Sequence, residues 1–480
     1  MTQESEGRNM RIIMKFGGAA VKDAKGISQV VKIIKNSTDQ KNEIIIVVSA
    51  LGGVTDTLVG MMKNVPSARK NWIDGSIESL AAFHLGTIKS ITDPMVAQKV
   101  TRNVKALLDE LKNVVTGISH VGELTPRSRD LLLSFGERLS IPIVAGALES
   151  EGIKAKPLTG GEAGILTDDN FGEAEPLMNV TSMQVKQILE PLLKEGVIPV
   201  VSGFIANSQN GSITTLGRGG SDYTAAIIGL SVKADELQFW KEVPGIMTAD
   251  PSLCSDSKLI KKIAFDEAIE IAHFGARVIH PRALEVGLES NLTYRIKYVW
   301  EPHKEGTLVV RSTDEKEDLK AVVRAISVID KVHLINIAGA RLVGTPRVAG
   351  RVLELLANED IDVLMISQSS SEANISIAVP EADADDAMNI LELSLLGSKL
   401  VREIKGEGGY CIVATVGRGM RGTPGVAAKV FKSMADHKVN IRTIAQGSSE
   451  LNISFMVSRK DMKAAVGALH KDFNLEAAWD

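Results

Sequence analysis

The sequence predicts an α/β protein in which a mostly parallel sheet, sandwiched by helices, is followed by two small α+β modules. Apolar strand-like runs alternate with amphipathic helical stretches over residues 11–299, which is typical of a parallel sheet covered by helices. An internal repeat occupies the last third of the chain. The length of 480 residues suggests about three domains at roughly 150 residues each.

The first region is built from short apolar strands and amphipathic helices. Strands are expected at Ile12–Phe16, Ile44–Ser49 and Ile198–Phe204, and the first two run into Gly-Gly pairs. Helical spacing of apolar residues predicts helices at Gly26–Asn36 and Asp222–Leu230. These strands belong to the predicted parallel sheet, and these helices are expected to cover it.

Further along, composition marks a helical segment and a linker. Residues 71–123 contain few glycines and repeat Leu, Ile and Val at three- and four-residue spacing, so they are expected to be largely helical. Residues 301–318 are rich in charge, which is typical of a solvated linker. We therefore expect these divisions: a disordered tail (1–10), a catalytic domain (11–300), a linker (301–320) and two modules (321–400 and 401–480).

The repeat has a shift of 78 residues. Gly344-Thr345-Pro346 recurs as Gly422-Thr423-Pro424, and residues 344–376 share 15 identities in 33 ungapped positions with the second copy. Each copy reads as strand, Gly-Thr-Pro turn, helix, strand, polar turn and strand. Two copies of one small sandwich can pair their sheets.

A G-x-G-x-x-G pattern at 417–422 invites a dinucleotide-binding interpretation. The first copy lacks the middle glycine, and the following strand does not end in an acidic residue that would hold a ribose. Only about 60 residues remain after Gly422. We expect these glycines to let the loop close over a small ligand or a neighbouring strand.

Composition excludes several classes of protein. The net charge of −4 argues against nucleic-acid binding. Two cysteines, Cys254 and Cys411, exclude a disulfide scaffold and a cysteine-built zinc site, and they suit a reducing cytosol. No apolar run approaches the roughly 20 residues of a membrane span, and the polar N-terminus does not resemble a secretory signal. We expect a cytoplasmic protein without nucleic-acid or membrane partners.

Two glycine motifs point to an anion site. Leu216–Thr224 is a Gly-rich loop before a helix, with Ser221 at or near the N-cap and Asp222 in the first turn. Arg218 adds a fork for a carboxylate. Lys15-Phe16-Gly17-Gly18 ends a strand, so its ammonium can reach a phosphate and its backbone N–H groups can approach phosphate oxygens. Asp222 is suited to hold a lysine near transferring phosphate.

Other chemistries lack their motifs. The chain has no P-loop, no His/Cys cluster with metal-ligand spacing and no G-x-S-x-G elbow. His273 and His280 are expected to be packed or capping residues. Glu137, just beyond an apolar run, is placed to bind an amino group, and Lys241–Pro251 follows a strand where nucleotides bind in open α/β folds.

Taken in order, these motifs identify a family. Lys15–Gly18, Ser134–Ser140, Gly217–Asp222, Val243–Pro251 and Phe274–Pro281 precede the tandem module. The set closely resembles the monofunctional aspartokinases, over residues from about 10 to 470. The resemblance implies an amino-acid-kinase fold followed by two ACT modules. It also implies ATP-dependent phosphorylation of the β-carboxylate of L-aspartate to 4-phospho-L-aspartate, with Mg²⁺ carried by ATP and no protein metal ligand. This step begins lysine, threonine and methionine biosynthesis.

The resemblance also assigns roles to individual residues. The catalytic residues are Lys15 and Asp222. The phosphate-binding residues are Gly17, Gly18, Gly219, Gly220 and Ser221. The substrate-binding residues are Ser49, Thr55, Glu137 and Arg218. The nucleotide-binding residues are Lys241, Glu242, Gly245, Met247, Asp250 and Arg277. The effector-binding residues are Gln368, Asn374, Gln446 and Asn452.

The sequence departs from the family pattern at three positions. Ala19 replaces the usual hydroxyl residue, Met247 a tyrosine and Ser252 a basic residue. These departures leave a catalytically weak amino-acid-sensing paralogue as an alternative, beside a kinase for glutamate or carbamate. A bifunctional kinase–homoserine dehydrogenase is not expected at this length. The ACT pair implies feedback by threonine and/or lysine, with the run at 366–372 closer to threonine-responsive members, and a homodimer or tetramer.

Overall fold

The computed structural model describes residues 10–275, 278–313, 321–339, 346–368, 374–396 and 401–477. The chain divides into two compact units. The first comprises Met1–Gly245, Lys261–Asp266 and Val278–Ser312. The second comprises Ile246–Ile260, Glu267–Arg277 and Thr313–Asp480.

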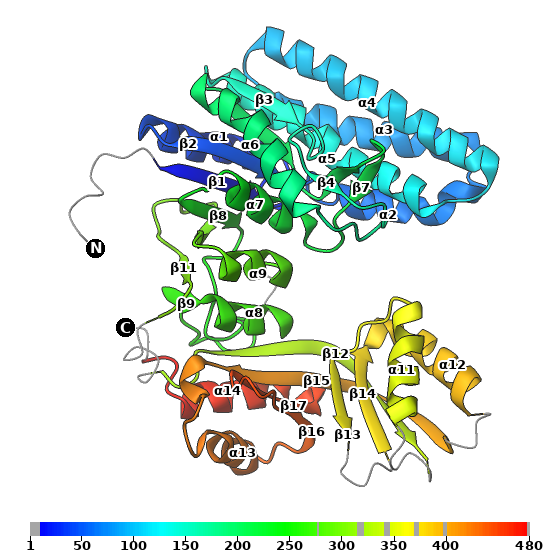
Figure 1. Ribbon diagram of the computed structural model, residues 1–480, viewed down its shortest axis with the longest axis vertical. Coiled ribbons are helices and arrows are strands. Elements are labelled where there is room, and N and C mark those ends of the chain that lie inside the picture. Colours follow the sequence, from blue (N-terminus) through cyan, green and yellow to red (C-terminus); the bar gives the residue numbers. More distant parts are fainter. Residues whose placement is uncertain are drawn as a thin grey trace. The chain divides into compact units, whose positions relative to one another are not determined.

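A single large sheet forms the centre of the first unit (Figure 1). Its strands lie in the order β3 (Ala155–Leu158), β5 (Ile198–Ser202), β2 (Glu43–Val48), β1 (Arg11–Phe16), β8 (Glu236–Lys241), β10 (Thr293–Tyr298), β11 (Thr307–Val310) and β9 (Lys262–Ala264). Every neighbouring pair is parallel except β10 and β11. The predicted mostly parallel sheet is confirmed. A smaller sheet holds β4 (Leu166–Thr167), β6 (Ile205–Ser208) and β7 (Ile213–Thr215).

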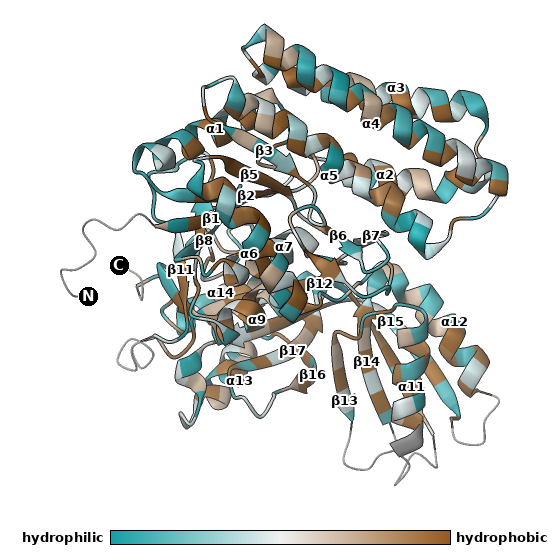
Figure 2. Cartoon of the chain, turned by 45° about the horizontal axis from the view of Figure 1, so that its top comes forward, coloured by the Kyte–Doolittle hydropathy of each residue, from teal (hydrophilic) through white to brown (hydrophobic). Residues whose placement is uncertain are grey.

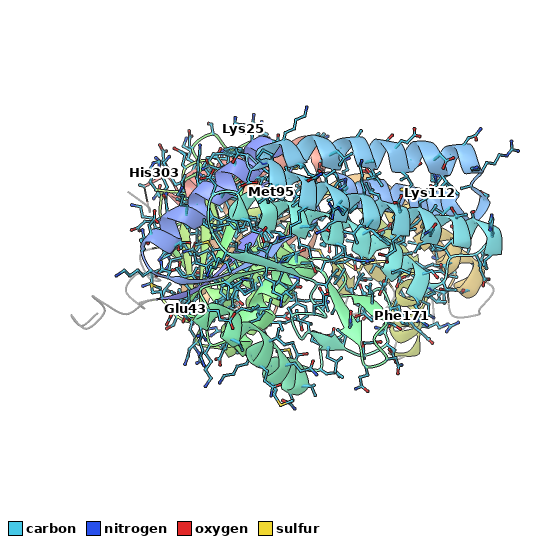
Figure 3. The ribbon with its side chains drawn as sticks, turned by 90° about the horizontal axis from the view of Figure 1, so that it is seen from above. Lys25, Glu43, Met95, Lys112, Phe171 and His303 are labelled. Atoms are coloured by element: carbon cyan, nitrogen blue, oxygen red, sulfur yellow. The ribbon has the colours of Figure 1, made fainter. Side chains whose placement is uncertain are left out.

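Helices cover this sheet because each connection between parallel strands must cross a face. The helices of this unit are α1 (Ala24–Asp39), α2 (Val54–Asn64), α3 (Lys70–Thr87), α4 (Pro94–Val121), α5 (Pro126–Glu149), α6 (Met178–Lys194), α7 (Gly220–Ser231) and α9 (Pro281–Glu289). Of these, α3 packs on α4, and α4 packs on α5 rather than on the sheet. The expected helical stretch at 71–123 is two helices, α3 and α4. Figure 2 shows hydrophilic and hydrophobic residues alternating along them, as amphipathic surface helices require. Met95 and Lys112 mark α4 in Figure 3. The Lys112 Nζ lies 2.7 Å from Asp74 Oδ1 of α3.

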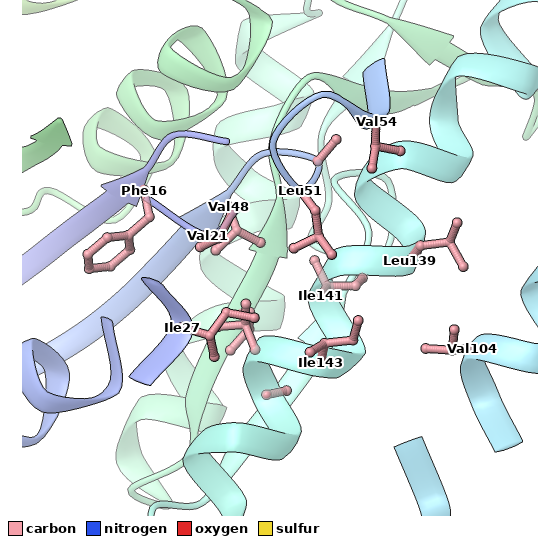
Figure 4. Close-up of a cluster of buried hydrophobic side chains, with 14 of the residues drawn as sticks. Phe16, Val21, Ile27, Val48, Leu51, Val54, Val104, Leu139, Ile141 and Ile143 are labelled. Carbon is pink, nitrogen blue, oxygen red and sulfur yellow. The ribbon is translucent and has the colours of Figure 1, made fainter. Parts of the chain in front are cut away.

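Helix α5 is the central buried helix. By length and composition alone it is apolar enough to cross a membrane, but 89% of its most apolar window is buried inside the protein. No stretch of the sequence was expected to be long and apolar enough to span a membrane, because polar residues such as Glu137 interrupt this apolar run. In Figure 4, Leu139, Ile141 and Ile143 of α5 pack in one cluster with Val48 and Leu51. Burial of this extent is typical of a core helix.

The second unit contains the repeat as one six-stranded sheet, in the order β13-β14-β12-β15-β17-β16. The first copy comprises β12 (Ala325–Ala338), α11 (Pro346–Asn358), β13 (Met365–Gln368), β14 (Asn374–Pro380) and α12 (Ala384–Leu395). The second comprises β15 (Glu403–Val416), α13 (Val426–Asp436), β16 (Ile441–Ala445), β17 (Asn452–Ser458) and α14 (Met462–Asp472). Shifting β12 and β14 by 78 residues reproduces β15 and β17. The predicted pairing of the two sheets is confirmed, through antiparallel β12 and β15. The closing helix of each copy was not predicted.

Short 3-10 turns complete the secondary structure: η1 (Val65–Ser67), η2 (Ile88–Ser90), η3 (Glu381–Asp383), η4 (Arg418–Met420) and η5 (Arg459–Asp461). The G-x-G-x-x-G pattern lies after β15, which is antiparallel to both of its neighbours. A dinucleotide fingerprint requires a parallel βαβ unit, so this is not its context. A Cβ at Gly417 would lie 2.4 Å from the carbonyl oxygen of Val322, so this glycine permits a close backbone approach.

The compact units do not follow the chain in simple succession. Residues 246–260 and most of α8 (Phe265–His273) lie in the second unit, although both fall inside the range predicted to be catalytic. The predicted linker, 301–320, contains strand β11, which pairs with β10 and β9 in the large sheet. Residues 314–320 lie outside the described part of the chain, and the predicted domain boundaries stay predictions.

Candidate active site

Three parallel strands deliver polar residues to one edge of the large sheet. Strand β1 pairs with β2 on one side and β8 on the other, all parallel, so their carboxyl ends meet. Lys15 lies at the end of β1, Ser49 directly follows β2, and Lys241 ends β8. The carboxyl edge of such a sheet is where open α/β folds bind their ligands.

A carboxylate joins two lysines at this edge. The Lys15 Nζ lies 2.6 Å from Asp222 Oδ1, and the Lys241 Nζ lies 3.2 Å from Asp222 Oδ2. Lys15 and Asp222 are both buried, at 5% and 6% exposure. This ion pair is the contact that the predicted orienting role of Asp222 requires, and the role itself stays a prediction. The second lysine on the same carboxylate was not anticipated.

The charges of this cluster shift the ionisation of Asp222 and of Lys241. Burial alone would raise the pKa of Asp222, but the ammonium groups of Lys15 and Lys241 outweigh it and hold that pKa well below its usual value. Burial lowers the pKa of Lys241 to about 8, with Asp222 opposing the shift and Lys15 adding to it. The cluster therefore carries two cations against one anion near neutral pH. That surplus positive charge suits a phosphate group.

The amino terminus of α7 completes the anion site. Its N-cap is Gly219, with φ +70°, rather than the expected Ser221, and Asp222 lies in the first turn as predicted. A Cβ on Gly219 would collide with the ring of His280, so the loop packs directly on that side chain. Among the described residues no side chain caps the helix; the Gly220 N–H donates to the Gly217 carbonyl oxygen at 3.0 Å, which leaves the N–H groups of Ser221 and Asp222 available to an anion. Gly220 is buried against Phe204.

Arg218 is exposed beside this helix terminus. Within the described part of the chain its guanidinium makes no hydrogen bond or ion pair, so it is available to a carboxylate. It precedes Asp222 by four residues. The chain therefore brings a free guanidinium to the vicinity of the lysine cluster.

Glu137 on α5 is a buried carboxyl group with spare bonding capacity. Its Oε1 accepts a hydrogen bond from the Ala50 backbone N–H at 3.1 Å, and its Oε2 has no partner among the described residues. Burial raises its pKa to about 8, with the Ala50 bond and the Lys15 charge opposing that shift. An orphaned carboxylate oxygen near a lysine cluster is suited to an ammonium group of a substrate.

Glycines hold the surrounding loops together. A Cβ at Gly18 would lie 2.9 Å from the Ala50 carbonyl oxygen, and one at Gly136 would lie 2.9 Å from the Ala50 Cβ. Gly17 lies directly beside the Lys15 ammonium. Loop 49–53 therefore bridges the lysine motif and α5. Of the loop residues expected to line the pocket, Ser49 is half-buried and Thr55 is exposed.

The predicted nucleotide residues fall in different parts of the structure. Lys241, Glu242 and Gly245 belong to the first unit, and Glu242 pairs with Lys22 at 3.3 Å. Met247 and Asp250 belong to the second unit. Arg277 lies outside the described residues.

The predicted effector residues differ between the two copies. Gln368 and Asn374 are exposed at adjoining ends of β13 and β14, and Gln446 is exposed after β16. Asn452 is instead nearly buried, and its Nδ2 donates to Glu270 Oε2 at 2.6 Å. The first copy therefore presents more free amide groups.

Sequence reasoning missed several residues that position the site. The Ser140 hydroxyl donates to the Ser49 carbonyl oxygen at 2.8 Å, which fixes α5 against the substrate loop. Buried Asp130 accepts from the Gly172 and Thr215 backbone N–H groups. The His280 backbone N–H donates to Asp222 Oδ2 at 3.3 Å. Ser140 and His280 lie in the motifs Ser134–Ser140 and Phe274–Pro281, but their contacts, like those of Asp130, join segments far apart in sequence and were not predicted.

Comparison with known proteins places this geometry in a family. The chain matches the amino acid kinase family over residues 10–297 and the ACT domain over 335–395 and 413–473. It is 30% identical to aspartokinase 1 of Arabidopsis thaliana, a chloroplastic enzyme, over 98% of this chain and 81% of that one. It is 30% identical to the aspartokinase of Geobacillus stearothermophilus over 97% of both.

Solved structures agree. Aspartokinase III of Escherichia coli, in a complex with aspartate and ADP, has a TM-score of 0.80 and 27% identity, covering 96% of this chain and 99% of that one. The same values hold for its complex with lysine and aspartate. The fold and the lysine–aspartate cluster define an amino acid kinase joined to two ACT domains. Within that class the chain belongs to the aspartokinases, which are ATP-dependent kinases.

Proposed function

We propose that the protein transfers the γ-phosphate of ATP to the β-carboxylate of L-aspartate, giving 4-phospho-L-aspartate and ADP. The observation that carries this proposal is the Lys15–Asp222–Lys241 cluster beside a buried Glu137 with a free oxygen. The cluster suits a phosphate, and Glu137 suits an amino group. E. coli aspartokinase III, bound to aspartate and ADP, has the same fold.

Positioning and charge neutralisation dominate phosphoryl transfer, and this chain supplies both. Lys15 and Lys241 would hold the phosphate oxygens, where charge grows in the transition state. Asp222 holds both ammonium groups in place. The attacking carboxylate is already ionised at neutral pH, so no general base is required.

The substrate would be held at its other two charged groups. The free guanidinium of Arg218 suits the α-carboxylate of aspartate, and Glu137 suits its ammonium. The described residues contain no group of three or more His, Cys, Asp or Glu side chains that could hold a metal ion. Mg²⁺ is therefore expected to enter on the phosphates of ATP.

Regulation, assembly and location complete the proposal. An end product of the pathway to lysine, threonine and methionine would bind the ACT modules, with threonine and/or lysine the first candidates. The edge strands β13 and β16 leave Ile366 and Ile444 exposed, each at 45%, which supports assembly into a homodimer or tetramer through these modules. We place the enzyme in the cytoplasm.

Trapping the acyl phosphate tests the reaction. Purified protein is incubated with ATP, Mg²⁺ and L-aspartate, hydroxylamine converts the product to a hydroxamate, and ADP release is followed in parallel. L-Glutamate and a reaction without acceptor serve as controls. We expect aspartate-dependent hydroxamate that disappears in Lys15→Ala. Lys35→Ala is the matched variant, because Lys35 is half-exposed and, within the part of the chain that the structure describes, its ammonium pairs only with Glu151 at the surface.

Each other outcome of these experiments would point to a different function. Hydroxamate formed with glutamate instead would assign the chain to a different acceptor. Folded protein that binds ATP but turns over neither acid would overturn the catalytic proposal. The amino-acid-sensing alternative, motivated by Ala19, would then be tested by titrating threonine, lysine and methionine. No binding of any of the three would refute the regulatory part.

A further inference from the structure

A segment of the predicted nucleotide motif is part of the second compact unit. Residues 246–260 leave the sheet after β8, which ends at Lys241, and rejoin it at β9. Within the second unit, Ala249 and Cys254 are buried in one hydrophobic cluster with Val430 of α13 and Leu469 of α14. The segment is therefore part of the core of the second ACT module.

Thr248 is held in this segment by hydrogen bonds of both its backbone and its side chain. Its backbone N–H donates to the Lys258 carbonyl oxygen at 2.9 Å, and its own carbonyl oxygen accepts from Ile326 at the start of β12 at 2.8 Å. Its hydroxyl oxygen accepts from the Lys258 backbone N–H at 2.9 Å. The same hydroxyl lies 2.9 Å from Nε2 of His470 on α14.

His470 makes this contact from inside the module. Its side chain is 2% exposed and Thr248 is fully buried, so water does not compete for the bond. Burial lowers the pKa of His470, which keeps the imidazole neutral and able to accept the hydroxyl proton. This bond is the side-chain hydrogen bond that joins the segment to α14 among the described residues.

The neighbouring residues of the segment face the other way. Met247 is half-buried and Asp250 exposed, whereas Thr248 and Ala249 between them are buried. A cavity of about 760 Å³, lined by Pro251, Leu253, Asp256, Lys463 and Lys471 among others, lies beside the remainder of the segment. Packing is therefore incomplete around Cys254 and His470, both of which line this cavity. The Thr248–His470 bond restrains where Met247 and Asp250 lie, together with the β-bridge between Met247 and Leu259 and the hydrogen bonds from Ser252 to Asp250.

We infer that His470 is a positioning residue for ATP: through Thr248, it fixes the Met247–Asp250 stretch in its nucleotide-binding conformation. This inference rests on the proposed role of that stretch in binding ATP. Apparent affinity falls with the fraction of molecules whose site is in the competent conformation. Loss of the restraint should therefore weaken ATP binding and leave the aspartate pocket, built from Glu137 and loop 49–53, unaffected.

A split between the two Michaelis constants tests the inference. In His470→Ala we expect the KM for ATP to rise by about fivefold or more, with the KM for aspartate changed less than about twofold. His470→Gln supplies a side-chain amide that can reach the Thr248 hydroxyl, so this variant should recover most of the ATP affinity. His437→Ala is the matched control, because His437 lies in the same module and, among the described residues, its side chain bonds only the Ser433 carbonyl oxygen four residues before it in the chain.

The outcomes separate this inference from the proposed function. Calorimetric binding of ADP to each folded variant gives the same comparison without turnover, so an inactive wild-type protein would refute the kinase proposal alone. An unchanged ATP KM and ADP affinity in folded His470→Ala would overturn the positioning role. An equal rise in both Michaelis constants, or failure of His470→Gln to recover affinity, would show that His470 only stabilises the module.

Discussion

Protonation of Glu137 should control how well the enzyme binds aspartate. The side chain is 3% exposed, and burial raises its pKa to about 8. A substrate ammonium group needs the ionised carboxylate, so the protonated form must lose its proton before aspartate binds. We therefore expect the KM for aspartate to rise as the pH falls below 8.

The size of the effect follows from the ionised fraction. With a pKa near 8, the observed KM is multiplied by one plus the ratio of protonated to ionised Glu137, about elevenfold at pH 7 and about a hundredfold at pH 6. Below pH 8 the KM for aspartate should thus increase about tenfold for each unit by which the pH falls. Above pH 8 it should level off.

Initial rates measured from pH 6 to 9, with saturating ATP and varied aspartate, test this directly. Lys241 also has a pKa of about 8, but its loss of charge above that pH should weaken ATP binding instead, so the two groups are separated by substrate. Glu137→Gln cannot ionise and should show a high KM that does not depend on pH. A wild-type aspartate KM that stays constant between pH 6 and 8 would refute the argument.

Three further predictions concern the same side chains and one buried ion pair. Because the folded-state pKa of Glu137 is raised, its protonated form is the stable one, and wild-type stability should fall by up to about 1.4 kcal/mol per pH unit as pH rises from about 4.5 to 8. Urea denaturation at pH 5 and 8 should show Glu137→Gln gaining on wild type at the higher pH, and a constant difference would contradict this. Lys15→Met should lower kcat by about a thousandfold with a near-normal melting curve, whereas a mainly raised aspartate KM would argue against a role in phosphoryl transfer. Arg324→Ala should cost about 3–5 kcal/mol, because it removes the guanidinium that lies 3.5 Å from the fully buried Glu267, whose Oε1 keeps the hydrogen bond from the Arg418 backbone N–H; a loss under about 1 kcal/mol would show that the remaining contacts of Glu267 compensate for its charge.

Local patterns were sufficient for much of the fold. Strand β1 and helix α1 follow from short-range apolar spacing, and their bounds differ from the predicted ones by one to three residues. The repeat shift of 78 residues correctly predicted two equivalent modules. The closing helices α12 and α14 were not predicted, because the identities between the two copies were found over residues 344–376, which end before α12 begins.

The pairing of Lys15 with Asp222 was implied by the family resemblance, although the two residues lie in separate motifs. Lys15 and Asp222 were expected to meet, and they do. Lys241 joins the same carboxylate from a different strand, which no local pattern encodes. Likewise the burial that shifts the pKa of Glu137 depends on how α5 packs against loop 49–53. Such properties arise from long-range packing, which spacing along a chain does not reveal.

The placement of residues 246–260 affects how the chain can be divided. A polypeptide cut near residue 312 would keep this segment but lose the strands and helices that cover Ala249, Leu253 and Cys254. Its newly exposed apolar surface would favour aggregation. The complementary fragment would lack the same side chains and have a hole in its own interior. Limited proteolysis in the charged stretch after β11 should therefore yield a nicked protein whose two pieces stay together, rather than two independently folding fragments.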